Sequence, residues 1–113
     1  MKNSLVLFLL FCFGLCFGQE YEAEIFEHQK YTLPYRILLP KDFNPQKSYP
    51  LLLVLHGAGE RGNDNVSQLF HGGTLFQSDE FRTQYPAIVV FPQCPKNSYW
   101  ANVLRDNSVN LDE

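Results

Sequence analysis

Residues 51–62 read LLLVLHGAGERG, and this stretch indicates the fold class. Residues 51–55 form a continuous apolar run, which is typical of a strand in a parallel sheet that helices cover on both faces. Gly57-Ala58-Gly59 breaks this strand sharply. A second continuous apolar run, residues 86–91, is ended by Pro92 and predicts another buried strand.

The rest of the chain places these two strands in a mixed sheet. Residues 65–85 have helix-like content, interrupted by Gly72-Gly73, and complete a βαβ unit whose strands are expected to be parallel. Upstream, residues 21–27 and 30–39 predict two half-buried strands that pair as an antiparallel hairpin. Residues 40–49 predict a surface loop. The predicted class is α/β, with an antiparallel first strand pair followed by a parallel βαβ unit.

The N-terminal segment has the layout of a secretory signal peptide. Lys2 precedes an apolar run over residues 5–17, and the small Gly18 stands before a polar segment. The run is shorter than the roughly 20 residues that a membrane-spanning helix needs, which disfavours a retained anchor. We expect a signal peptide over residues 1–18, export of the protein, and no stable membrane insertion after cleavage. Residues 19–113 then form one incomplete domain.

Charge and cysteine content exclude several functions. The chain has 113 residues and a formal net charge of −3 without basic clusters, so no electrostatic feature favours nucleic acid or an anionic membrane as partner. Cys12 and Cys16 leave with the signal peptide, and Cys94 cannot form a disulfide within the remaining chain. A buried, unreactive thiol is favoured over pairing with another chain. No spacing of Cys, His or Asp predicts a metal site, and His71 is interpreted as a surface or packing residue.

The glycines of the loop after residue 55 allow three interpretations. Gly57, Gly59 and Gly62 fit the dinucleotide fingerprint G-x-G-x-x-G. That site requires a helix opening within the motif and an acidic residue after the next strand, and both are missing. A turn that merely ends a strand is not excluded by three glycines alone. The third interpretation is an oxyanion loop, in which small residues let the backbone approach the reacting oxygen to about 3 Å.

Residues 54–62, 91–95 and 99–100 together resemble exported α/β-hydrolases of the esterase and prolyl-oligopeptidase-like group. The resemblance implies that the loop after the third strand supplies a backbone N–H to the oxyanion. Ala58 is the first choice of donor and Gly59 the second. The residues expected to support this loop are His56, Gly57, Glu60 and Arg61. Tyr99 and Trp100 are candidates for lining the substrate cleft, with ordinary packing equally open.

The resemblance also implies a catalytic triad, but none of its members is recognised in this sequence. The serines of residues 19–113 are Ser48, Ser67, Ser78, Ser98 and Ser108, and none lies between glycines as in G-x-S-x-G. The expected order is nucleophile, acid, histidine, so all three are expected beyond Glu113. The predicted function is a serine hydrolase that acts on small-molecule esters or peptides without a cofactor. The alternative is a non-catalytic exported binding module or a gene fragment.

Overall fold

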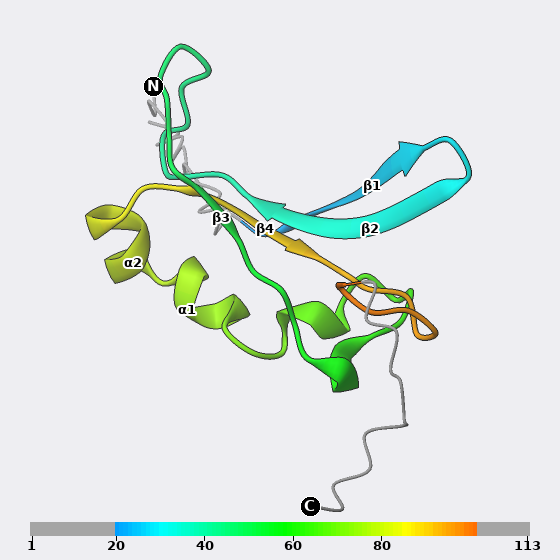
Figure 1. Ribbon diagram of the computed structural model, residues 1–113. Helices are drawn as coiled ribbons and strands as arrows, with labels where there is room; N and C mark the ends of the chain where they lie inside the picture. Colours follow the sequence, from blue (N-terminus) through cyan, green and yellow to red (C-terminus); the bar gives the residue numbers. More distant parts are fainter. Residues whose placement is uncertain (1–19, 102–113) are drawn as a thin grey trace, which may run out of the picture.

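The computed structural model describes residues 20–101, which form a mixed four-stranded sheet with short helical segments (Figure 1). The strands are β1 (Glu22–His28), β2 (Tyr31–Leu38), β3 (Leu51–Leu53) and β4 (Ile88–Pro92). Their order across the sheet is β1-β2-β4-β3. The predicted signal peptide, residues 1–18, and the end of the chain from residue 102, which includes Ser108, lie outside the described residues.

The sheet is antiparallel on one side and parallel on the other. β1 pairs antiparallel with β2, and β2 pairs antiparallel with β4. β3 runs parallel to β4, which it reaches through the helical segments of residues 58–84. The predicted hairpin and the predicted parallel pair are both confirmed. The parallel pairing also sets the site, because the carboxyl ends of β3 and β4 meet at the same edge of the sheet.

The connection between β3 and β4 is broken into short helical pieces. They are η1 (Ala58–Glu60), η2 (Ser67–Leu69), α1 (Gly73–Gln77) and α2 (Asp79–Gln84). Gly72 has a φ of 93°, a left-handed conformation that glycine adopts without steric cost and that separates η2 from α1. Ser78 begins α2 by accepting a hydrogen bond from the N–H of Phe81 at 3.2 Å. The predicted interruption at Gly72-Gly73 is therefore present, and a second one follows at Ser78.

The core lies between the sheet and helices α1 and α2, which Figure 1 shows on one side of the strands. Phe91 of β4 is fully buried and contacts the rings of Tyr21 and Phe76 edge-on at centroid distances of 5.5 and 5.7 Å. The hydroxyl of Tyr21 donates to the carbonyl oxygen of Gly73 at 2.9 Å. Burial raises the pKa of Tyr21 to about 12, partly opposed by the charge of Arg82. These contacts fix β4 against the helices.

The opposite face of the sheet is largely exposed within residues 20–101. Leu51 and Leu53 of β3 are 66% and 60% exposed, and every residue of β1 is exposed. Two expectations are therefore wrong for the described residues: the strand at 51–55 is not covered on both faces, and the first strand is not half-buried. Successive strand residues point to opposite faces, and the helices cover only one of them. β3 also ends at Leu53, two residues earlier than predicted.

Candidate active site

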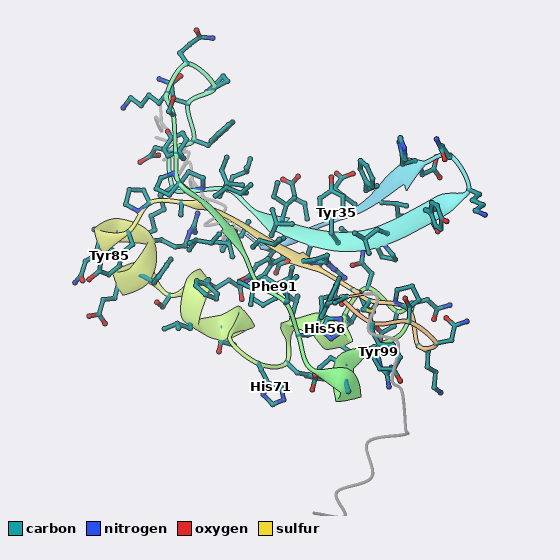
Figure 2. All side chains as sticks on the ribbon, in the orientation of Figure 1. Tyr35, His56, His71, Tyr85, Phe91 and Tyr99 are labelled. Carbon is teal, nitrogen blue, oxygen red and sulfur yellow. The ribbon has the colours of Figure 1, made fainter. Side chains whose placement is uncertain are left out.

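The loop of residues 56–62 and the segment of residues 94–100 lie side by side at the carboxyl edge of the sheet. The first follows β3 and contains η1, and the second follows β4. The backbone of Gly62 donates a hydrogen bond to the carbonyl oxygen of Cys94 at 3.0 Å, which joins the two segments. Figure 2 shows His56 and Tyr99 together at this end of the sheet and Tyr85 at the other.

His56 links the two segments through its ring and its backbone. The N–H of Cys94 donates to Nε2 of His56 at 2.9 Å, so Nε2 carries no proton. In the neutral ring the proton is then on Nδ1, which donates to the carbonyl oxygen of Gly57 at 2.6 Å. Trp100 donates from its indole nitrogen to the carbonyl oxygen of His56 at 3.0 Å, and the two rings lie 5.0 Å apart. Both ring nitrogens are engaged, which suits a residue that holds the loop rather than a catalytic base.

Ala58 and Gly59 have backbone N–H groups without a hydrogen-bond partner among the described residues. Both residues are exposed, and no hydrogen bond among residues 20–101 uses either N–H. The preceding Gly57 is tightly placed, since a Cβ there would lie 3.2 Å from a carboxylate oxygen of Glu60. A Cβ on Gly59 would meet nothing within 4 Å, so this position opens toward solvent. The loop can therefore offer two adjacent N–H donors to a ligand.

Glu60 and Arg61 connect the loop to neighbouring segments. A carboxylate oxygen of Glu60 lies 3.2 Å from Nε2 of His71. Arg61 donates from Nε to the carbonyl oxygen of Ala58 and from Nη1 to that of Ser98, each at 3.0 Å. Its guanidinium carbon lies 4.9 Å from the centre of the Tyr99 ring, within the range of a cation–π contact. These contacts fit the interpretation of both charges as loop braces.

Gln93 is a supporting residue that the sequence did not single out. It follows β4, is fully buried, and accepts a hydrogen bond at Oε1 from the N–H of Asn65 at 2.7 Å. Its Nε2 donates to the carbonyl oxygen of Glu60 at 3.1 Å and to Asp64 Oδ1 at 2.7 Å. The sequence feature that could have identified Gln93 is its position as a polar residue directly after an apolar strand. A polar residue that is buried there must find hydrogen-bond partners.

Asp64 and Asn65 complete this support. The Asp64 carboxylate accepts from the hydroxyl and N–H of Ser67 and from the N–H of Val66. These bonds, the Ser67 hydroxyl first, hold the pKa of Asp64 well below its usual range. Asn65 has a φ of 51°, and its side-chain amide donates to the carbonyl oxygen of Tyr35 at 3.2 Å. The residues directly after the loop are thus attached to β2 as well as to Gln93 at the end of β4.

A small hollow of about 80 Å³ opens beside the loop. Its lining residues are His56, Gly57, Ala58, Arg61, Cys94, Tyr99 and Trp100. The structure therefore brings Tyr99 and Trp100 next to Ala58, the first candidate donor. Cys94 is buried and forms no disulfide among the described residues.

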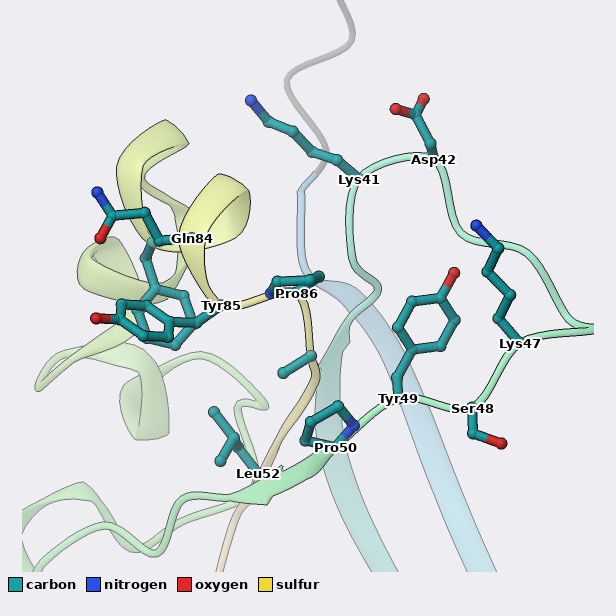
Figure 3. A pocket seen from close by; sticks show the side chains of 12 residues that line it. Lys41, Asp42, Lys47, Ser48, Tyr49, Pro50, Leu52, Gln84, Tyr85 and Pro86 are labelled. Atoms are coloured by element: carbon teal, nitrogen blue, oxygen red, sulfur yellow. The ribbon is translucent and has the colours of Figure 1, made fainter.

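A larger hollow of about 950 Å³ lies elsewhere, at the amino end of β3 (Figure 3). Lys41, Lys47, Tyr49 and Tyr85 are among its lining residues, and no histidine is. It is remote from the His-Gly loop, and neither Ala58 nor Gly59 reaches it. Size alone does not make it the candidate site, because among the described residues no base is hydrogen-bonded to the hydroxyl of Ser48, the serine in its lining.

Residues 20–101 contain neither a candidate metal site nor a candidate membrane span. No group of three or more His, Cys, Asp or Glu side chains in this range could hold a metal ion. None of the helices in it has the length and apolar character of a membrane span.

Comparisons with known proteins identify a structural relative. No protein-family model matches the sequence, and no curated protein does. The crystal structure of a thermostable esterase is similar, with a TM-score of 0.70 and 38% sequence identity over 79% of this chain. The match spans 25% of the esterase chain, so this chain corresponds to about a quarter of that protein's length. The described sheet and helices resemble part of an esterase fold.

Proposed function

We propose that this chain is the N-terminal part of an exported serine hydrolase that cleaves carboxylic esters through an acyl-enzyme. Its contribution is the oxyanion loop, with the N–H groups of Ala58 and Gly59 as donors. The observation that carries the proposal is this pair of unbonded N–H groups, on two exposed residues of a loop that His56 and Arg61 brace. The similarity to a thermostable esterase favours esters over peptides as substrates.

The proposed chemistry explains why the loop consists of small residues. When a nucleophile attacks an ester carbonyl, negative charge develops on the carbonyl oxygen. Backbone N–H groups that are already oriented stabilise this charge without having to reorganise. Exposed Gly57, Ala58 and Gly59 leave room for a substrate to approach the backbone. The nucleophile, the acid and the histidine are proposed to lie beyond Glu113, in the order given by the family resemblance.

Activity-based labelling of the full-length protein tests this proposal. We expect a fluorophosphonate to label one serine beyond Glu113 and p-nitrophenyl acetate to be hydrolysed. The fragment of residues 19–113 should do neither, because it contributes no nucleophile. A full-length protein that is neither labelled nor active contradicts the proposed function and favours the alternative of a binding module. Hydrolysis by the purified fragment above a matched-protein blank contradicts the placement of the triad.

Export is proposed from the N-terminal segment alone. N-terminal sequencing of the protein recovered outside the cytoplasm should begin at Gln19 if residues 1–18 are a signal peptide. A chain that keeps Met1 in all fractions contradicts this part of the proposal.

A further inference from the structure

We propose that Arg61 is a positioning residue for the oxyanion loop, which orients and polarises the peptide group between Ala58 and Gly59. The inference rests on the proposed function, because it assigns Arg61 an effect on the developing oxyanion. It starts from the hydrogen bond of 3.0 Å that Nε of Arg61 donates to the carbonyl oxygen of Ala58. That oxygen belongs to the same peptide group as the N–H of Gly59.

A planar trans peptide group points its C=O and its N–H in opposite directions. Holding the carbonyl of Ala58 against Arg61 therefore aims the N–H of Gly59 away from Arg61. A charged donor on the carbonyl also draws electron density from the amide, which makes its N–H a stronger donor. Arg61 thus acts on the oxyanion donor from the far side of the peptide bond, without touching substrate.

The preceding peptide group is held in the same way. His56 donates from Nδ1 to the carbonyl oxygen of Gly57, which shares its peptide group with the N–H of Ala58. Each candidate donor N–H therefore has a side chain bound to the carbonyl at the other end of its own peptide group. A brace that merely tied down the loop could attach to any carbonyl, whereas these two attach to the pair that sets both donor directions.

The second hydrogen bond of Arg61 explains why arginine suits this position better than lysine. Nη1 donates to the carbonyl oxygen of Ser98, and the guanidinium lies over the ring of Tyr99. The rigid planar fork of arginine can bind both carbonyls while it stacks on the ring, whereas the flexible ammonium of lysine has no such fixed geometry. Arg61 therefore fixes the Ala58 carbonyl relative to the segment after β4.

The test compares Arg61→Met and Arg61→Lys with Lys96→Met in the full-length protein. Lys96 is an exposed cation on the segment after β4, so its replacement controls for lost charge. We expect kcat on p-nitrophenyl acetate to fall about 10- to 100-fold in Arg61→Met and about tenfold in Arg61→Lys. KM should stay within about twofold, and the affinity for a boronic acid that forms a tetrahedral adduct should fall in parallel with kcat/KM. Added methylguanidinium should partly restore kcat in Arg61→Met.

The possible results distinguish a failure of the proposed function from a failure of the role of Arg61. A wild-type protein that neither hydrolyses esters nor reacts with fluorophosphonate overturns the proposed function, and this inference with it. If the wild type is active, a kcat for Arg61→Met within about threefold of Lys96→Met overturns only the role of Arg61. A raised KM at unchanged kcat overturns it too, since Arg61 would then bind the substrate itself. If circular dichroism shows that Arg61→Met does not fold, the same criteria applied to Arg61→Lys decide.

Discussion

The two loops that flank β3 are held in place in different ways. In the loop after β3, His56 bonds to Cys94, and Arg61 bonds to Ser98, both far away in the sequence. In the loop before β3, residues 40–50, the N–H of Asn44 donates to the Tyr49 hydroxyl at 3.0 Å. The N–H groups of residues 46 and 47 donate to the side chain and backbone of Asn44. The middle of this earlier loop, residues 44–49, is held by its own residues, while Lys41 and Pro50 near its ends bond to Asp79 and to the N–H of Ile88.

The difference shows what a loop needs in order to present its backbone to a ligand. In the loop before β3 the N–H groups of residues 44, 46 and 47 make internal bonds, so these three groups are not available to a ligand. Residues 56–65 are fixed by their side chains and by the N–H groups of Gly62 and Asn65, which donate to Cys94 and Gln93, while the N–H groups of Ala58 and Gly59 stay unbonded. The loop after β3 is held in place while these two N–H donors stay available. Oxyanion stabilisation requires this, because donors that are already oriented need not reorganise.

The largest expected effect comes from Ala58→Pro in the full-length protein, which removes one of these N–H groups. Loss of one oxyanion donor typically lowers turnover by about 10²–10³-fold. Ala58 is the first residue of η1, and Gly57 before it is extended, with ψ of −178°. Proline is tolerated at such a position, and the residue before it is required to be extended, so the backbone should keep its course. The measurement is kcat for p-nitrophenyl acetate, with fluorophosphonate labelling retained at a lower rate.

Ala58→Ser is the control for Ala58→Pro, because it keeps the N–H and adds little bulk. Its turnover should stay close to that of the wild type. Circular dichroism of both variants checks the fold first. A folded Ala58→Pro protein with wild-type turnover shows that Ala58 is not a donor. The difference between the two loops would then be unrelated to oxyanion stabilisation.

The second prediction sharpens the contrast through Gln93→Leu, which keeps the size of a buried side chain and removes its hydrogen bonds. The N–H of Asn65 and the carbonyl of Glu60, both in part-buried hydrogen bonds, lose their partner, and leaving such a group unsatisfied costs about 1–3 kcal/mol. We expect the free energy of unfolding to fall by about 2–4 kcal/mol in urea titrations. Gln46→Leu, an exposed residue of the loop before β3, is the matched control and should change stability by less than about 0.5 kcal/mol. If Gln93→Leu and Gln46→Leu lowered the free energy of unfolding equally, the proposed difference between the two loops would be contradicted.

The backbone course of the sheet could be predicted from local patterns. Continuous apolar runs at residues 51–55 and 86–91 indicated the parallel pair, and the hairpin followed from two extended runs joined by a short polar link. β4 is largely buried, as its apolar run predicted, but the exposure of β1 and β3 could not be predicted in the same way. It depends on which face the helices cover, and Leu51 and Leu53 lie on the face without helices in the described residues.

The candidate site was predicted less completely. The glycine spacing and the family resemblance pointed to Ala58 and Gly59, because a loop that offers its backbone needs small residues. His56, Glu60 and Arg61 were expected to support the loop, but the roles of Gln93 and Asp64 were missed. These two residues lie 29 positions apart and meet only once β4 returns beside β3. Hydrogen bonds between distant segments leave no periodic pattern in a sequence. Only the position of a glutamine directly after an apolar strand hinted at a buried polar contact.

The third prediction concerns the pH dependence of the same network. Hydrogen bonds from Ser67, Val66 and Gln93 depress the pKa of Asp64 in the folded protein. A depressed folded pKa stabilises the protein above the unfolded pKa of about 3.9, and this stabilisation is lost as pH falls toward the folded value. In urea titrations the stability difference between the wild type and Asp64→Asn should be constant from about pH 8 to 6 and shrink below about pH 4. A difference that persists undiminished at pH 3 would refute this role for the carboxylate.

The smallest effect is expected for Tyr49→Phe, in the loop before β3. The substitution removes the hydroxyl that accepts from the N–H of Asn44 but keeps the ring that packs 5.5 Å from Phe43. Water can replace the lost acceptor at this half-buried position, so the free energy of unfolding should fall by only about 0.5–1 kcal/mol. Turnover should not change, because Tyr49 lines the hollow at the amino end of β3, away from the oxyanion loop (Figure 3). If Tyr49→Phe lowered kcat as strongly as a change at Ala58, the two loops would be coupled through β3. The loop before β3 would then belong to the active site rather than to the scaffold.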